Sequence, residues 1–112
     1  MKLMNTITER KWRQQLLESR LIFKDKNHPL VQTLVLHHHA TEQAILLNWI
    51  PDQTCDDYLT LIDGHYLVSV EIEHNRPIDT CVIETISLHE YKQSLSRQSA
   101  IQLEVALDIV AS

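Results

Sequence analysis

Residues 58–73 read YLTLIDGHYLVSVEIE, in which Asp63-Gly64 separates two apolar runs. Asp-Gly between two such runs is the strongest short-range signal for a β-hairpin, because both residues tolerate the positive φ of a two-residue turn. Such a turn also fixes the register, since the cross-strand pairs follow by counting outward from it. The sequence therefore predicts strands over 58–62 and 65–73. The predicted pairs are Ile62 with His65, Leu61 with Tyr66, and Leu59 with Val68.

Three more segments have the apolar patterning of strands, at residues 31–36, 44–50 and 81–86. Residues 40–43 connect the first two as a hairpin turn or as a short helical piece, and we favour the turn. Segment 44–50 is apolar at nearly every position. A strand that is apolar on both faces needs cover on both sides, so we expect this segment to be the central strand.

Helices are predicted at both ends of the chain. Thr6 and Glu9 have the spacing of a capping box, which begins a helix over 7–22. Ser87 and Glu90 repeat that spacing before a C-terminal helical pattern. Residues 96–99 interrupt this pattern with residues that prefer caps to helix interiors. We therefore favour a short helix followed by a longer one over 100–110, with one kinked helix as the alternative.

The order of these elements indicates an α+β fold. We expect an antiparallel meander sheet of four or five strands, with the N-terminal helix and one or two C-terminal helices packed on one face. The chain has 112 residues, which suits a single domain over 1–112 with one core.

Composition excludes several classes of function. Gly64 is the only glycine, so the glycine-rich phosphate loops of nucleotide enzymes cannot be built. Ten Lys and Arg against fifteen Asp and Glu give a net charge of −5, which repels phosphate backbones and argues against nucleic-acid binding. The chain has neither an apolar run long enough for a membrane helix nor an apolar leader, so we expect a cytoplasmic protein that binds no membrane. Cys55 and Cys81 are then expected to be reduced thiols.

The seven histidines include the run His37-His38-His39. On a strand, consecutive side chains point to opposite faces, so only His37 and His39 could share a metal ion. A third ligand would have to come from elsewhere, with His65 or Glu42 the nearest candidates. We therefore expect no metal, no cofactor and no catalytic residue.

A group of carboxylates forms a second candidate site. The predicted register places Asp56 opposite Glu71, with Glu73 two residues further on the same face. Clustered carboxylates can hold a divalent cation or act as acid and base, and with His65 they would suit a metal-dependent hydrolase. No lysine lies nearby in sequence to neutralise developing charge. We favour the alternative, in which acids at a hairpin end discourage edge pairing.

We expect the protein to be a non-enzymatic binding or adaptor module that acts as a homodimer. Two or three helices cannot easily cover every apolar face of the predicted sheet, and exposed apolar patches mark interfaces. The predicted interface residues are Trp49, Tyr58, Ile62 and Leu67. The acidic surface would engage a basic protein partner. The alternatives are the metal-dependent hydrolase and a small-ligand-binding protein with a pocket between sheet and helices.

Overall fold

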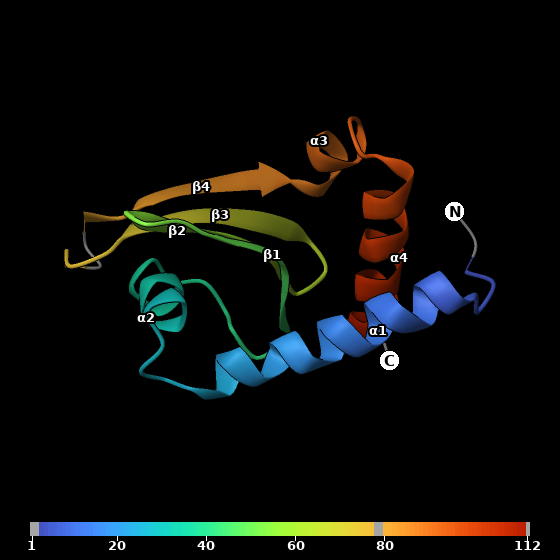
Figure 1. Ribbon diagram of the computed structural model, residues 1–112, viewed down its shortest axis with the longest axis horizontal. Helices are drawn as coiled ribbons and strands as arrows, with labels where there is room; N and C mark the ends of the chain where they lie inside the picture. Colours follow the sequence, from blue (N-terminus) through green and yellow to red (C-terminus); the bar gives the residue numbers. More distant parts are fainter. Residues whose placement is uncertain (1–2, 78–79, 112) are drawn as a thin grey trace.

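A computed structural model describes residues 3–77 and 80–111 (Figure 1). Four strands form one sheet, with helical segments before and after them. In chain order the elements are α1 Ile7–Ser19, the 3₁₀ helix η1 Arg20–Lys24, α2 Pro29–Leu36, β1 Ala44–Pro51, β2 Cys55–Ile62, β3 Tyr66–Glu73, β4 Val82–Ser87, α3 Leu88–Lys92 and α4 Arg97–Ala111.

The sheet is an antiparallel meander in the order β1-β2-β3-β4. The α+β class and the succession of N-terminal helix, strands and C-terminal helices are thereby confirmed. The prediction that 44–50 is the central strand is wrong, because β1 lies at an edge with β2 as its hydrogen-bonded neighbour. Its first four residues are nevertheless buried, because elements on both sides of the sheet cover them.

Residues 31–36 form most of the helix α2, so the predicted strand and the hairpin connection after it are wrong. Pro29 occupies the first turn of α2, where its missing N–H costs nothing. The ring of His28 caps this end, with Nδ1 accepting a hydrogen bond from the backbone N–H of Leu30 at 3.1 Å. Leu30 and Leu34 lie one turn apart and are fully buried. Tertiary packing of this apolar stripe therefore outweighs the strand preference of the valines.

The terminal helices follow the capping signals with small shifts. Thr6 and Glu9 form the predicted capping box, but α1 ends at Ser19 and continues as η1. Ser87 caps α3 by accepting the backbone N–H of Glu90 at 3.1 Å. The hydroxyl of Ser96 accepts the backbone N–H of Ser99 at 3.2 Å, so α4 begins at residue 97 rather than 100.

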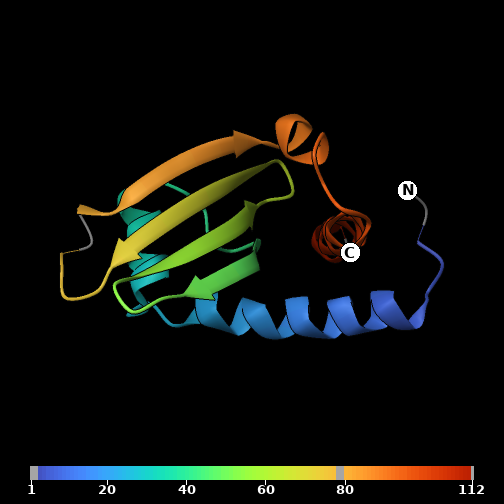
Figure 2. The ribbon, with the colours of Figure 1, turned by 45° about the horizontal axis from the view of Figure 1, so that its top comes forward.

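Two apolar clusters lie on opposite faces of the sheet. On the α2 face, α2 and η1 pack on the side chains of Leu46, Tyr58, Ile62, Val68 and Val70, among others. On the α4 face, α1, α3 and α4 pack on those of Ile45, Leu47, Leu61 and Leu67, among others. Figures 1 and 2 show α2 against one side of the sheet and α4 beside the end of the sheet. The helices therefore do not all lie on one face, because α2 covers the second one.

The hairpin forms where Asp63-Gly64 predicts it, but with a loop of three residues. The backbone N–H of His65 donates to the carbonyl of Ile62 at 2.9 Å, and both Asp63 and Gly64 have positive φ. The observed pairs are Ile62 with Tyr66, Leu61 with Leu67, and Thr60 with Val68. The predicted register is thus wrong by one residue. Leu59 packs on the α4 face and Val68 on the α2 face.

No helix in the described ranges 3–77 and 80–111 is long and apolar enough to cross a membrane.

Candidate functional site

The α4 face of the sheet is covered at only one end. Helices α1, α3 and α4 pack near the 63–65 loop, while the half of this face that bears the start of β2 and the end of β3 is open (Figure 2). One row of directly paired residues crosses all four strands there. We call it the acidic row, and it consists of Ile50, Asp57, Glu71 and Val82. All four side chains are exposed, and Ile50 and Val82 have exposed fractions of 54% and 63%.

The one-residue shift of register changes which carboxylates come together. Asp57, not Asp56, is the residue opposite Glu71. Asp56 pairs with Ile72 instead and points to the other face, where its Oδ1 lies 3.2 Å from Nε2 of His74. The predicted cluster of Asp56, Glu71 and Glu73 is therefore not assembled, because consecutive residues of a strand point to opposite faces.

The histidine of the alternative hydrolase is also distant from the carboxylates. His65 lies in the hairpin loop directly before β3, six residues before Glu71 of that strand. At about 3.3 Å per residue this separation is about 20 Å. The histidine and the carboxylates of the alternative hydrolase therefore lie near opposite ends of β3.

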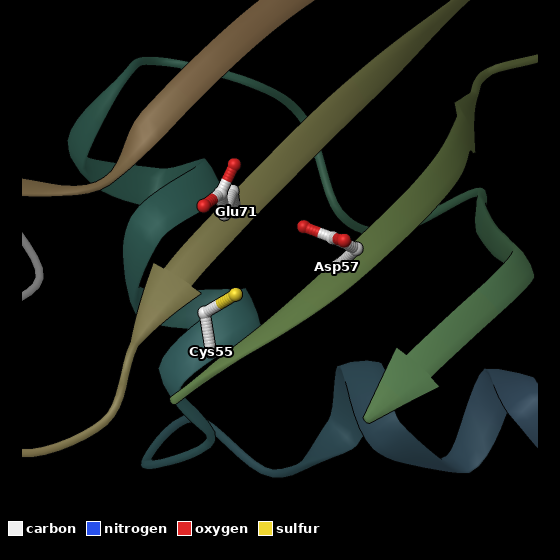
Figure 3. Close-up of side chains that lie close together, drawn as sticks. All are labelled: Cys55, Asp57 and Glu71. Carbon is white, nitrogen blue, oxygen red and sulfur yellow. The ribbon is translucent and has the colours of Figure 1, made fainter. Parts of the chain in front are cut away.

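Cys55 joins the two central acids of the row. Its Sγ and one carboxylate oxygen each of Asp57 and Glu71 lie within 4.8 Å of one another (Figure 3). Among residues 3–77 and 80–111 this is the only such group of three potential metal ligands. Burial raises the pKa of the Cys55 thiol, and the negative charges of Glu71 and Asp57 raise it further, against a hydrogen bond from Thr54 that lowers it. The thiol therefore stays protonated at neutral pH, and the carboxylates are the groups available to a cation.

Asp57 and Glu71 have no cationic partner among the residues that the structure describes. Glu73, which pairs with Cys55 across the strands, forms an ion pair with Arg76 at 3.0 Å. Charge is also unevenly distributed along the sequence: seven of the ten Lys and Arg residues occur in 1–26, while twelve of the fifteen Asp and Glu residues occur in 27–112. The acidic row is thus left with uncompensated negative charge.

The four predicted interface residues occupy different environments. Tyr58, Ile62 and Leu67 have exposed fractions of 6%, 0% and 0%, because they pack in the core of the monomer. Trp49 is 52% exposed, and its ring stacks on Tyr58 with 6.2 Å between ring centroids. Burial, followed by the charge of Asp56, raises the pKa of Tyr58 to about 12. Of the four residues, Trp49 is the one placed to contact a partner.

The three consecutive histidines follow the end of α2 and diverge. Nδ1 of His37 lies 2.9 Å from the carbonyl of Thr33, within the helix end. His38 has a positive φ, and Nδ1 of His39 lies 2.7 Å from the hydroxyl of Tyr66. Burial lowers the pKa of His39, and His37 and His38 lower it further. His37 thus bonds within the end of α2, while His39 contacts Tyr66 of β3.

Sequence reasoning missed an apolar groove between α1, η1 and α2. Leu17, Leu21, Val35 and Leu36 line it with exposed fractions of 46%, 61%, 56% and 49%. Its two adjoining hollows have volumes of about 530 Å³ and 490 Å³. Leu17 of α1 and Leu21 of η1 are a signal in the sequence. Because 31–36 was predicted to be a strand, the side of the groove that α2 forms was not expected.

The chain was compared with known proteins, and no family model, curated protein or solved structure matches it. The geometry above is therefore what supports a function.

Proposed function

We propose that this protein is a non-enzymatic binding module whose acidic row binds a Lys or Arg side chain of a basic protein partner. The observation that carries the proposal is the direct pairing of Asp57 with Glu71. Like charges directly opposite one another destabilise a sheet. Protection of a sheet edge cannot explain this pair, because β2 and β3 are the two inner strands. A cation bound between the two carboxylates would turn this repulsion into attraction.

The ends of the acidic row indicate what surrounds that cation. Ile50 and Val82 flank the carboxylates and expose apolar surface. Strands lie about 4.8 Å apart, so the row is about 14 Å long. A partner segment with a basic residue between two apolar residues would match this pattern of charge and hydrophobicity.

A synthetic peptide of alternating Lys and Leu residues tests the proposal, with a peptide of alternating Glu and Leu as its control. We expect calorimetry to detect binding of the Lys peptide that weakens as salt is added. Combining Asp57→Asn with Glu71→Gln should weaken binding about tenfold, since each exposed ion pair contributes up to about 1 kcal/mol. The matched control combines Glu18→Gln with Glu90→Gln, which are exposed and lie outside the row and the groove.

Three results would contradict the proposal. The first is equal binding of the Lys and Glu peptides. The second is full binding by the Asp57→Asn, Glu71→Gln variant. The third is stoichiometric binding of Zn²⁺ that is lost in a Cys55→Ser variant, because that would favour a metal centre built on Cys55, Asp57 and Glu71.

The module is proposed to act as a cytoplasmic homodimer. The open half of the α4 face is a poor dimer interface, because two acidic rows would face each other. The groove lined by Leu17, Leu21, Val35 and Leu36 is a better one, since it exposes four large apolar side chains. The charged residues that also line it carry both signs: Arg20, Lys24, Lys26 and Glu42. Helix α2 and η1, which form much of this groove, pack on the face of the sheet opposite to the one that bears the acidic row. A dimer through this groove would leave both acidic rows free to bind partners.

A further inference from the structure

A cleft lies between α1, α3, α4 and the edge strand β1, with a volume of about 390 Å³. Residues 46–49 of β1 line this cleft. A β-bulge between Leu46 and Asn48 leaves Leu47 without a cross-strand partner there. Gln102 of α4 reaches across and donates from Nε2 to the carbonyl of Leu47 at 2.6 Å. Bulges of this kind often lie next to binding sites because they change the direction of neighbouring groups.

The oxygen Oε1 of the Gln102 side-chain amide is the acceptor that a ligand in this cleft could use. Gln102 is only 8% exposed and lines the cleft. Because Nε2 is the donor to Leu47, Oε1 is the free acceptor of this amide. No donor among the described residues bonds to Oε1. Oε1 is not among the fully buried side-chain atoms that lack a partner, so solvent reaches it in the cleft. A ligand donor could therefore replace water at this fixed acceptor.

The other residues that line the cleft indicate that such a ligand is uncharged. Trp12 and Tyr91 supply aromatic surface, while Gln15, Asn48 and Ser99 supply neutral polar groups. No Asp, Glu, Lys, Arg or His side chain lines the cleft. Burial raises the pKa of Tyr91, so its hydroxyl is uncharged at neutral pH as well. A charged ligand would lose hydration here without finding an opposite charge.

We propose that the cleft binds a small uncharged ring compound through an N–H or O–H group that donates to Gln102 Oε1. The aromatic side chains would pack on the ring, and the neighbouring amides would bond its other polar atoms. The volume lies within the range of small-molecule sites, which combine apolar walls with a few fixed polar groups. This site is independent of the acidic row and of a protein partner.

Chemical-shift mapping with three probes tests the proposal. Benzamide carries an uncharged amide on an aromatic ring, glucose carries uncharged hydroxyls on a saturated ring, and benzoate is the charged counterpart of benzamide. We expect benzamide or glucose, at low-millimolar concentration, to shift the Trp12 indole and Gln102 side-chain signals saturably. The probe that does so identifies the ring type. Benzoate should leave these signals unchanged.

A matched pair of variants localises the binding. Gln15 and Gln14 are neighbours on α1 and are both exposed, but only Gln15 lines the cleft. Gln15→Phe should fill the cleft and weaken binding at least about tenfold. Gln14→Phe should bind as the wild type does. The Asp57→Asn, Glu71→Gln variant should also retain binding, which separates this inference from the proposed function.

Three outcomes would overturn the inference. One is that neither uncharged probe shifts the cleft signals saturably. Another is that benzoate binds as tightly as benzamide, which would contradict selection for an uncharged ligand. The last is unchanged binding by Gln15→Phe, with circular dichroism showing that this variant and Gln14→Phe are equally folded.

Discussion

The side chain of Glu9 stabilises the start of α1 and the residues before it. Its carboxylate accepts hydrogen bonds from the backbone N–H of Met4, Asn5 and Thr6 and from the hydroxyl of Thr6. Burial raises the pKa of this carboxyl, but the hydrogen bonds from Thr6, Asn5 and Met4 together outweigh it and lower the pKa. The chain before α1 is therefore tied to the first turn of the helix through an ionised group.

This lowered pKa predicts a pH-dependent contribution to stability. A carboxyl with a lower pKa in the folded state stabilises the fold above its unfolded pKa, and this contribution is lost as pH falls through its folded pKa. We expect Glu9→Gln to unfold at lower urea concentration than the wild type at pH 7, with the difference closing below about pH 4. Glu18→Gln, on the exposed face of α1, is the control. A difference that stays constant from pH 7 to about pH 3 would contradict this origin.

At the scale of elements, the facing carboxylates of β2 and β3 predict a variant that is more stable than the natural sequence. Asp57→Asn removes the repulsion with Glu71 and should raise the free energy of unfolding by about 0.2–1 kcal/mol. Urea unfolding at low salt measures this change. Glu84→Gln is the matched control, because Glu84 is exposed on the same face but pairs with Ser69. A loss of stability in Asp57→Asn would show that the two carboxylates do not repel each other in the fold.

The strand pairs also explain how far the sequence could predict the fold. Asp63-Gly64 located the hairpin, but its register depends on which face of each strand is buried. Here both faces are apolar near the loop, since Leu61 packs on the α4 face and Ile62 on the α2 face. Apolar patterning therefore could not separate registers one residue apart. The position of Gly64 against α4, where an added Cβ would lie 3.4 Å from Val110, is a tertiary contact that local sequence does not reveal.

The candidate site was predicted in part for the same reason. Glu71 was identified and lies in the acidic row, but its partner was taken as Asp56 rather than Asp57. These two residues are adjacent, so a shift of one residue exchanges the faces on which they lie. The groove and the cleft could not be predicted, because both need helices to be placed against each other. Pro29 was the available signal for α2, since proline favours the first turn of a helix.

At the scale of the whole molecule, the proposed homodimer can be tested. We expect light scattering at micromolar concentration to give twice the mass of the chain. Leu21→Glu, at a position that is 61% exposed in the groove, should give a folded monomer, because the charge cannot be buried in the interface. Leu67→Asp cannot serve as this test, since Leu67 is fully buried and its substitution would unfold the monomer.

Trp49→Glu is the comparison for that experiment, because Trp49 is exposed and lies outside the groove. It should leave the dimer intact. If Trp49→Glu dissociates the dimer and Leu21→Glu does not, the interface lies around Trp49, as the sequence suggested, and the groove is free. A wild-type monomer would contradict the homodimer itself.

The contact between α1 and α4 sets the order in which this chain can fold during synthesis. The earliest helix packs against the last one, and an ion pair between Arg13 and Asp108 joins them (Figure 1). A ribosome completes α1 long before α4 exists, so the apolar cluster that contains Leu16 lacks its α4 residues until 97–111 have emerged. The α2 face can form earlier, because all its helical cover precedes the strands. During synthesis the sheet can therefore be covered by helices on its α2 face first. Its α4 face is fully covered only after α4 has left the ribosomal tunnel.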